Sequence, residues 1–143
     1  MANGAQQRRR SIGKDVARTM NDPSEKPALL IVDDERNFAE SLQLAIDDQY
    51  AVSIAGSLAS ARSELGRSNP VAVLLDLRLP DGDGLDLLRE LSRGVDPPVV
   101  VVMTAFATHD TYLRSMGLGA ADYLSKPLDV RLLRNVLSRH LTS

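Results

Sequence analysis

The sequence VAVLLDLRLPDGDG, residues 71–84, decides the fold of the chain. Residues 71–75 form a continuous apolar run, which is typical of a strand buried on both faces, and Asp76 follows it directly. Residues 79–84 are rich in Pro, Asp and Gly, which favour a tight turn, and leucines with helical spacing come next. A buried strand, a turn and a helix in this order predict an α/β protein with parallel strands.

The same alternation of strand and helix occurs five times from residue 28 onward. It predicts a parallel sheet with helices on both faces and right-handed crossovers. Most of the runs are continuously apolar, which indicates central strands, whereas Ser53 interrupts the second run and indicates an edge. The expected strands are residues 28–32, 51–55, 71–75, 99–103 and 121–124.

The punctuation of the helices agrees with this architecture. Ser57 and Asp129 are suitable N-cap residues, and Gly117 stands where a left-handed residue is expected to end a helix. In that helix the apolar spacing predicts that Tyr112 and Leu113, together with Met116, face the core. The segment 79–84 lacks the ligand spacing of an EF-hand loop, so we exclude that kind of calcium site.

Length and composition bound the class of protein. The chain has 143 residues, 43% of them hydrophobic and 25% charged, with a formal net charge of −2, which suits one domain with a sizeable core. Cysteine is absent, which excludes disulfides, thiol catalysis and thiolate zinc sites. Five aromatic residues without Trp argue against a base-stacking surface for nucleic acids. Apolar runs of at most five residues and the lack of a signal segment predict a cytoplasmic, non-membrane domain.

Charge divides the chain into two parts. Residues 1–26 carry six Lys or Arg and three Asp or Glu. Residues 27–143 carry eleven Lys or Arg and sixteen Asp or Glu. We expect residues 1–26 to be a disordered basic arm and residues 27–143 to be the folded domain. The Arg run at residues 8–10 is expected to be solvated, and we expect no direct nucleic-acid binding by the domain.

Chemically useful side chains follow four of the five expected strands. Asp33 and Asp34 follow the first strand, Asp76 the third, Thr104 the fourth and Lys126 the fifth. Lys126 is the only lysine beyond residue 26, in a domain that otherwise uses arginine. The carboxyl ends of parallel strands meet at one edge, where open sheets bind their ligands, so we expect these side chains to converge.

Taken singly, these residues are as compatible with helix caps and turns as with a site. Together they have the composition of a phosphoryl-accepting site. Crowded carboxylates call for a cation, and hard oxygen ligands select Mg²⁺, with Mn²⁺ as an alternative. A carboxylate beside such an ion can attack phosphorus, while an ammonium and a hydroxyl hold the other phosphoryl oxygens. The sequence therefore predicts phosphoryl acceptance on Asp76, assisted by Lys126 and Thr104.

Four motifs follow one another along the chain: VDDE at 32–35, LDLRLPDG at 75–82, MTA at 103–105 and YLSKP at 123–127. Together they resemble the receiver domain of bacterial two-component response regulators. This resemblance implies a flavodoxin-like (βα)5 fold with strand order 2-1-3-4-5. It also implies Mg²⁺-dependent transfer of a phosphoryl group to Asp76 from a histidine kinase or a phosphotransfer protein.

The resemblance also implies individual roles. Asp34 and Asp76 would be direct metal ligands with the Arg78 backbone carbonyl, while Asp33 would act through a metal-bound water. Lys126 and Thr104 would hold phosphoryl oxygens, and the Lys126–Pro127 peptide bond is expected to be cis.

Further expectations concern the signal that follows phosphorylation. Tyr123 matches the family's aromatic switch residue, whose ring turns inward when Thr104 moves toward the phosphoryl group. The resulting change would alter the face formed by the fourth helix, the strand at 121–124 and the last helix, which is a possible homodimer surface. Arg78 and Phe106 occupy positions that influence water access, and their size predicts a long phosphoryl lifetime.

Other functions remain alternatives to a regulatory receiver, which is not an enzyme beyond self-catalysed phosphotransfer and dephosphorylation. Haloacid-dehalogenase phosphatases also use an Asp after a strand, but they need a second Asp where this chain has Arg78. A dinucleotide or P-loop binder is disfavoured because GLG at 117–119 lacks a third Gly and no Gly-Lys-Ser/Thr occurs. A stand-alone phosphorelay shuttle and a receiver excised from a Fis-type transcriptional activator both fit, and any output is expected outside the given sequence.

Overall fold

A five-stranded parallel sheet forms the centre of the molecule. A computed structural model of the protein describes residues 25–141, so most of the predicted arm at 1–26 lies outside the described residues. The sheet has the order β3-β2-β4-β7-β8. In the domain's own count this is 2-1-3-4-5, which confirms the predicted topology. The strands are β2 (Ala28–Val32), β3 (Ala51–Ala55), β4 (Ala72–Leu75), β7 (Val99–Thr104) and β8 (Asp122–Ser125).

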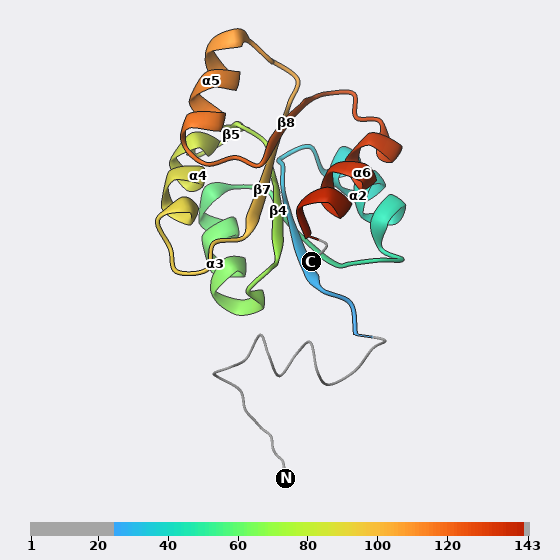
Figure 1. Cartoon of the computed structure of the whole chain (residues 1–143). Helices are drawn as coiled ribbons and strands as arrows, with labels where there is room; N and C mark the ends of the chain where they lie inside the picture. Colours follow the sequence, from blue (N-terminus) through green and yellow to red (C-terminus); the bar gives the residue numbers. More distant parts are fainter. Residues whose placement is uncertain (1–24, 142–143) are drawn as a thin grey trace.

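Helices cover both faces of the sheet. As Figure 1 shows, α2 (Arg36–Ile46) and α6 (Val130–Leu141) lie on one face. The other face carries α3 (Leu58–Ser68), α4 (Gly84–Ser92) and α5 (His109–Gly117). None of the helices within residues 25–141 has the length and apolar character needed to cross a bilayer.

The strands bury alternate residues in two separate core layers. In β2, Leu30 and Val32 pack toward α3 and α4, whereas Leu29 and Ile31 pack toward α2 and α6. The same alternation holds in β4 and β7, whose residues are nearly all inaccessible to solvent. Continuous apolar runs therefore become central strands because both of their faces are covered by helices.

Hydroxyl and carboxylate caps set where the helices begin. Ser57 accepts a hydrogen bond from the Ser60 backbone and Thr108 accepts one from Thr111, so both α3 and α5 start with a reciprocal capping box. The Asp129 carboxylate accepts from the Arg131 N–H at the start of α6, as the sequence predicted.

Two local expectations for α5 are wrong. The left-handed residue after this helix is Gly119, at φ +107°, while Gly117 ends the helix itself. Tyr112 and Leu113 are 43% and 53% exposed, and Ser115 is the buried residue of α5. Met116 packs against the core as the spacing predicted, so the hydrophobic spacing was right for Met116 and wrong for Tyr112 and Leu113.

A short hairpin follows the central strand β4. It pairs β5 (Arg78–Leu79) with β6 (Gly82–Asp83) and leads directly into α4. Gly84 begins that helix where a Cβ atom would overlap the Asp76 carbonyl oxygen and lie 2.9 Å from the Leu77 Cα. Glycine at position 84 therefore lets α4 start against the backbone of Asp76.

Candidate functional site

The backbone holds two of the predicted acidic residues at the carboxyl edge of the sheet. Asp33 follows β2, and its N–H donates to the Ala55 carbonyl oxygen at 2.9 Å. Asp76 follows β4, and its N–H donates to the Val32 carbonyl oxygen at the same distance. Both residues are buried, so these extensions of the strand ladder fix where the two carboxylates can lie.

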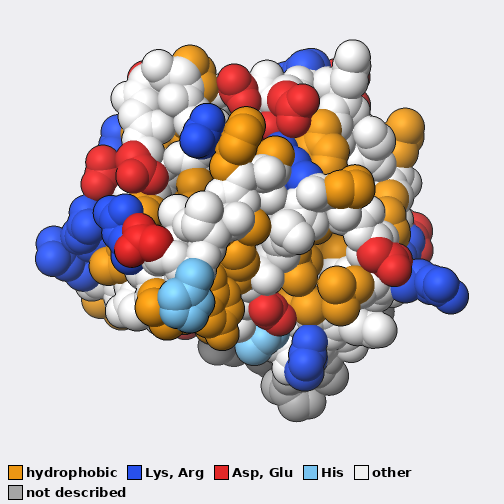
Figure 2. Space-filling model, turned by 90° about the horizontal axis from the view of Figure 1, so that it is seen from above, with side chains coloured by type: hydrophobic (Ala, Val, Ile, Leu, Met, Phe, Trp, Pro, Cys, Tyr) orange, Lys and Arg blue, Asp and Glu red, His pale blue; other side chains and the backbone are white. Residues whose placement is uncertain are grey.

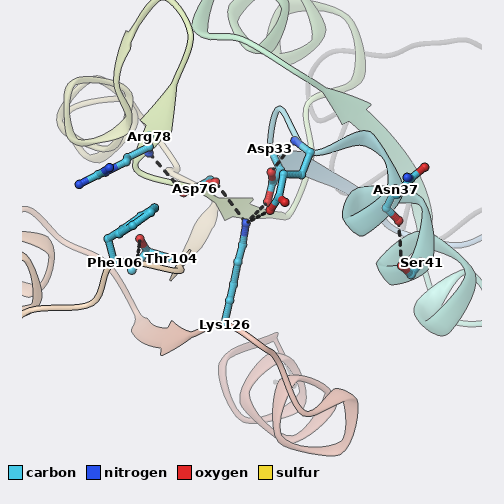
Figure 3. A network of polar contacts seen from close by, with 9 residues as sticks. Asp33, Asn37, Ser41, Asp76, Arg78, Thr104, Phe106 and Lys126 are labelled. Atoms are coloured by element: carbon cyan, nitrogen blue, oxygen red, sulfur yellow. Dashed lines mark hydrogen bonds and ion pairs between the residues drawn. The ribbon is translucent and has the colours of Figure 1, made fainter.

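Lys126 reaches from the end of β8 to the centre of this cluster. Its Nζ lies 2.7 Å from Asp33 Oδ2 and 3.2 Å from Asp76 Oδ2, and Figure 3 shows the ammonium between these carboxylates. Glu35 Oε1 is a third partner at 3.2 Å. The Lys126 side chain is only 8% exposed, so the ammonium is screened little by water. The Lys126–Pro127 peptide bond is cis.

Asp34 completes an acidic group that fits a divalent cation. One carboxylate oxygen each from Asp33, Asp34 and Asp76 lies within 4.8 Å of the others, and Asp34 is exposed to solvent. Carboxylate oxygens are the donors that Mg²⁺ prefers, so this group has the donor chemistry of a magnesium site.

Burial and ion pairing both shift the pKa values of this cluster. Burial raises the pKa of Asp33 above its ordinary value, against the hydrogen bonds that it accepts from Lys126 and from the Glu35 N–H. The pKa of Lys126 is raised as well, because its bond to Asp33 and the charges of Asp76 and Asp33 outweigh its own burial. Lys126 therefore keeps its positive charge, but this single charge does not balance the carboxylates of Asp33, Asp34 and Asp76.

Thr104, Arg78 and Phe106 border this cluster. Thr104 is buried, its Oγ1 accepts from the Phe106 N–H at 3.1 Å, and its carbonyl oxygen accepts from the Lys126 N–H at 2.8 Å. The Arg78 N–H donates to Asp76 Oδ1 at 3.2 Å. Arg78 and Phe106 line, with Asp34, Asp76 and Lys126, a cavity of about 320 Å³.

Tyr123 lies away from the carboxylates, against α5. Its hydroxyl is 2.5 Å from Thr111 Oγ1, and its ring packs edge-on against Tyr112 with centroids 5.6 Å apart. The structure therefore brings Asp33, Asp34, Asp76 and Lys126 together and places Tyr123 at the boundary of β8 and α5.

Other residues of the site were not singled out by the sequence. Glu35 and Phe38 both contact Lys126, the latter with its ring centroid 4.3 Å from Nζ. Thr111 binds the Tyr123 hydroxyl, and Asp81 accepts hydrogen bonds from the backbone of α3. Glu35 could have been found from its place beside the Asp pair, but the other contacts join segments far apart in the chain.

Figure 2 looks down on this edge of the sheet from above the view of Figure 1. Acidic, basic and hydrophobic side chains are interspersed across much of the face that this view shows.

Comparison with known families identifies the class to which this fold and site belong. Residues 29–138 match the family model of the response regulator receiver domain. The chain belongs to that family, and the resemblance drawn from its motifs is confirmed.

Relatives and solved structures agree with this assignment. The chain is 37% identical over 103 residues to the acid tolerance regulatory protein ActR of Rhizobium meliloti, covering 71% of this chain and 53% of ActR. It resembles the receiver domain of a putative LuxO repressor from Vibrio parahaemolyticus with a TM-score of 0.76, at 29% identity over 81% of this chain and 90% of that one.

A third similar protein bears on the chemistry. It is a response regulator from Burkholderia pseudomallei, solved with a phosphorylated aspartic acid, a calcium ion and citrate. It is 27% identical with a TM-score of 0.73, and the match covers 78% of this chain and 66% of that one. The chain spans about half the length of the curated relatives it matches.

Proposed function

We propose that this receiver accepts a phosphoryl group on Asp76 from a histidine kinase or a phosphotransfer protein, with Mg²⁺ as the cofactor. The observation that carries the proposal is the Lys126 ammonium between the buried carboxylates of Asp33 and Asp76. The phosphorylated aspartic acid of the Burkholderia relative supports it. The proposal places the domain in the cytoplasm, where ATP-dependent kinases act.

The proposed reaction is a displacement at phosphorus. A carboxylate oxygen of Asp76 forms a bond to phosphorus while the bond from phosphorus to the donor nitrogen breaks, and that nitrogen keeps the electron pair. Mg²⁺ held in this site would supply positive charge to the phosphoryl oxygens. Asp34, Asp76 and the Arg78 carbonyl would hold the ion directly and Asp33 through a water.

Lys126 and Thr104 would hold the remaining phosphoryl oxygens. The Lys126 ammonium is already 3.2 Å from the Asp76 carboxylate, so it needs little displacement to follow an oxygen transferred there. The Thr104 hydroxyl accepts from the Phe106 N–H and keeps its own proton for donation. Positioned donors of this kind stabilise the charge of the transferring group.

Transmission of the signal is proposed to pass through Thr104 and Tyr123. Movement of the Thr104 hydroxyl toward the phosphoryl group would let the Tyr123 ring turn inward and leave Thr111, which alters the face formed by α5, β8 and α6. That face would contact a partner or a second copy of the chain. A change from mostly inactive to mostly active requires a differential free energy of about 3–5 kcal/mol.

Two features weigh against the alternative of an aspartyl phosphatase. Arg78 stands two residues after Asp76, where such enzymes need an acid, and an arginine does not give up its proton. The Arg78 guanidinium instead packs over the Phe106 ring, 3.8 Å from its centroid. We expect this pair to restrict water and to lengthen the lifetime of the acyl phosphate.

The output remains part of the proposal. Two of the relatives that the chain matches over about half of their length are named as transcriptional regulatory proteins, so we infer that this receiver controls a transcriptional output. A phosphorelay shuttle is the second candidate, and it differs in returning the phosphoryl group to a histidine.

The test is incubation with acetyl phosphate and Mg²⁺, followed by intact-mass measurement. We expect the addition of one phosphoryl group in the wild type and none in Asp76→Asn. Asp34→Asn should react much more slowly, because it lacks a direct ligand. Beryllofluoride with Mg²⁺ should shift the NMR signals of Tyr123. Full labelling of Asp76→Asn would place the acceptor elsewhere.

A further inference from the structure

Lys126 has an aromatic partner in addition to its three carboxylates. The Phe38 ring centroid lies 4.3 Å from the Lys126 Nζ, well within the distance of about 6 Å at which a cation is attracted to a ring face. The three carboxylates of Asp33, Glu35 and Asp76 match the three N–H donors of the ammonium. The contact with the Phe38 ring is therefore a cation–π contact, whereas the other three are charged hydrogen bonds.

The fold holds the Phe38 ring in this position. Phe38 lies in the first turn of α2, four residues after Asp34 along the chain, and it is half-buried. It packs against the core layer beneath α2 and α6, which contains Leu42 and Leu133. A ring anchored in the core presents a fixed surface to the ammonium, unlike the exposed Glu35 carboxylate, which is 66% accessible.

Two of the three carboxylate partners of Lys126, Asp33 and Asp76, are also groups that the proposed reaction changes. Phosphorylation converts Asp76 from a free carboxylate into an acyl phosphate, and a bound cation competes with Lys126 for Asp33 and Asp76. The Phe38 ring is neutral and has no ligand atom for a hard cation, so neither event alters its attraction for the ammonium. Apart from the exposed Glu35 carboxylate, the Phe38 ring is the described partner of Lys126 that the reaction leaves unchanged.

We propose that Phe38 is a positioning residue that keeps the Lys126 ammonium aimed at the oxygens of the group on Asp76. The inference rests on the proposed function for its effect on phosphorylation. The contact between Phe38 and Lys126 in the unphosphorylated protein does not depend on it. The two parts are therefore tested by separate measurements.

Fluorination of the Phe38 ring separates this role from simple packing. Fluorine atoms nearly preserve the size of the ring but progressively remove the negative charge of its face, which weakens the attraction for a cation. We expect the rate of phosphorylation by acetyl phosphate to fall in steps through the mono-, di- and trifluorinated rings. The largest loss should be roughly 2- to 30-fold, and Phe38→Leu should match it, whereas Phe38→Tyr should keep most of the rate.

NMR of the metal-free, unphosphorylated protein provides the second readout. The chain contains only three lysines (Lys14, Lys26 and Lys126), so lysine-selective labelling gives a simple spectrum. The Lys126 Hε protons should be shifted upfield by the Phe38 ring, and this shift should disappear in Phe38→Leu.

The second phenylalanine supplies a matched control. Phe106 is the only other phenylalanine in the chain, and the residue is 56% exposed. Its ring contacts the Arg78 guanidinium and not Lys126. The same fluorinated series at Phe106 should leave the Lys126 Hε shift unchanged.

Each result decides a separate part of the proposal. A rate that stays flat through the fluorinated series at Phe38 would overturn the positioning role. An unchanged Lys126 shift in Phe38→Leu would overturn the contact itself. If the wild type accepts no phosphoryl group, the proposed function and with it the positioning role fail, while the NMR measurement still decides the contact.

Discussion

The Arg78 guanidinium lies over the Phe106 ring, 3.8 Å from its centroid, and so joins the loop after β4 to the loop after β7. Both side chains line the cavity that contains Asp76. We expect Phe106→Ala to open this cavity to water and to shorten the half-life of the acyl phosphate. The loss of a partly exposed cation–π contact corresponds to a roughly two- to fivefold change.

A double-mutant cycle checks this prediction through phosphate release. Arg78→Ala and Phe106→Ala should shorten the half-life by similar factors, and the double variant should be little faster than either, because they remove one contact. Phe106→Leu is the control variant, because it keeps most of the apolar volume at position 106 but removes the aromatic ring. A wild-type half-life of only seconds would contradict the proposed protection.

Removal of the Lys126 charge is expected to destabilise the metal-free protein. Lys126→Met leaves Asp33 and Asp76 buried without a counter-charge, which costs about 3–5 kcal/mol when a buried pair is broken. Urea unfolding at neutral pH measures this loss. Lys26→Met is the control, because Lys26 is exposed and donates only to the Asp47 carbonyl oxygen among its described contacts.

Addition of Mg²⁺ should restore part of that stability. A divalent cation supplies the missing positive charge, and a ligand at one hundred times its Kd stabilises the folded state by about 2.7 kcal/mol. The effect should vanish when Asp34→Asn is combined with Lys126→Met. Equal stability of Lys126→Met and wild type without metal would show that the ammonium does not compensate the buried carboxylates.

Asp81 links the hairpin after β4 to the start of α3, and this link should depend on pH. Its carboxylate accepts from the Leu58 N–H at 2.8 Å and from the Ala59 N–H at 3.0 Å, and these bonds hold the pKa of Asp81 below its ordinary value of 3.8. A lowered pKa means that the stabilisation is present above pH 3.8 and is lost as the pH falls through the folded-state value.

Thermal unfolding of Asp81→Asn tests this link. We expect the variant to melt below the wild type at pH 7, and the difference to shrink in acid as the wild-type carboxyl group is protonated. Asp110→Asn is a suitable control, because among the described residues that carboxylate has an exposed ion pair with Arg114 at 3.8 Å and no hydrogen bond from a backbone N–H. A difference that is the same at pH 7 and pH 3 would mean that charge on Asp81 has no part in it.

Ser115 offers a substitution that should stabilise the protein. Its side chain is fully buried in α5, and the hydroxyl has no hydrogen-bond partner among residues 25–141. A buried unpaired polar group costs about 1–3 kcal/mol, so Ser115→Ala should gain up to about 1 kcal/mol after the loss of packing.

Ser63→Ala separates this effect from helix propensity. Ser63 is an exposed residue in the interior of α3, where the same exchange changes propensity alone. Urea unfolding should show a larger gain at position 115 than at position 63. A loss of stability in Ser115→Ala would show that the hydroxyl has a partner.

The sequence predicted most of the fold because the strands are short, apolar and separated by clear turn and cap residues. It failed for α5, where Thr111 and Ser115 rather than Tyr112 and Leu113 turn toward the interior. Met116 packs against the core as predicted, but hydrophobic spacing cannot reveal the hydroxyl-bearing side chains that turn inward beside it.

The sequence predicted those residues of the candidate site that directly follow a strand. Asp33, Asp76 and Lys126 follow strands that meet at one edge, so their convergence follows from topology. The contact of Phe38 with Lys126 depends on the path of a long side chain between segments far apart in the chain. No local pattern in the sequence marks such a contact.

Borohydride trapping is the most direct test of phosphorylation at Asp76. An acyl phosphate is reduced by borohydride to the alcohol, so a phosphorylated Asp76 becomes homoserine, whereas a free carboxylate is unchanged. After treatment of the wild type with acetyl phosphate and Mg²⁺, peptide mass spectrometry should find homoserine at position 76 and at no other aspartate. Homoserine at a different position, or none in protein that carries a phosphoryl group, would contradict Asp76 as the acceptor.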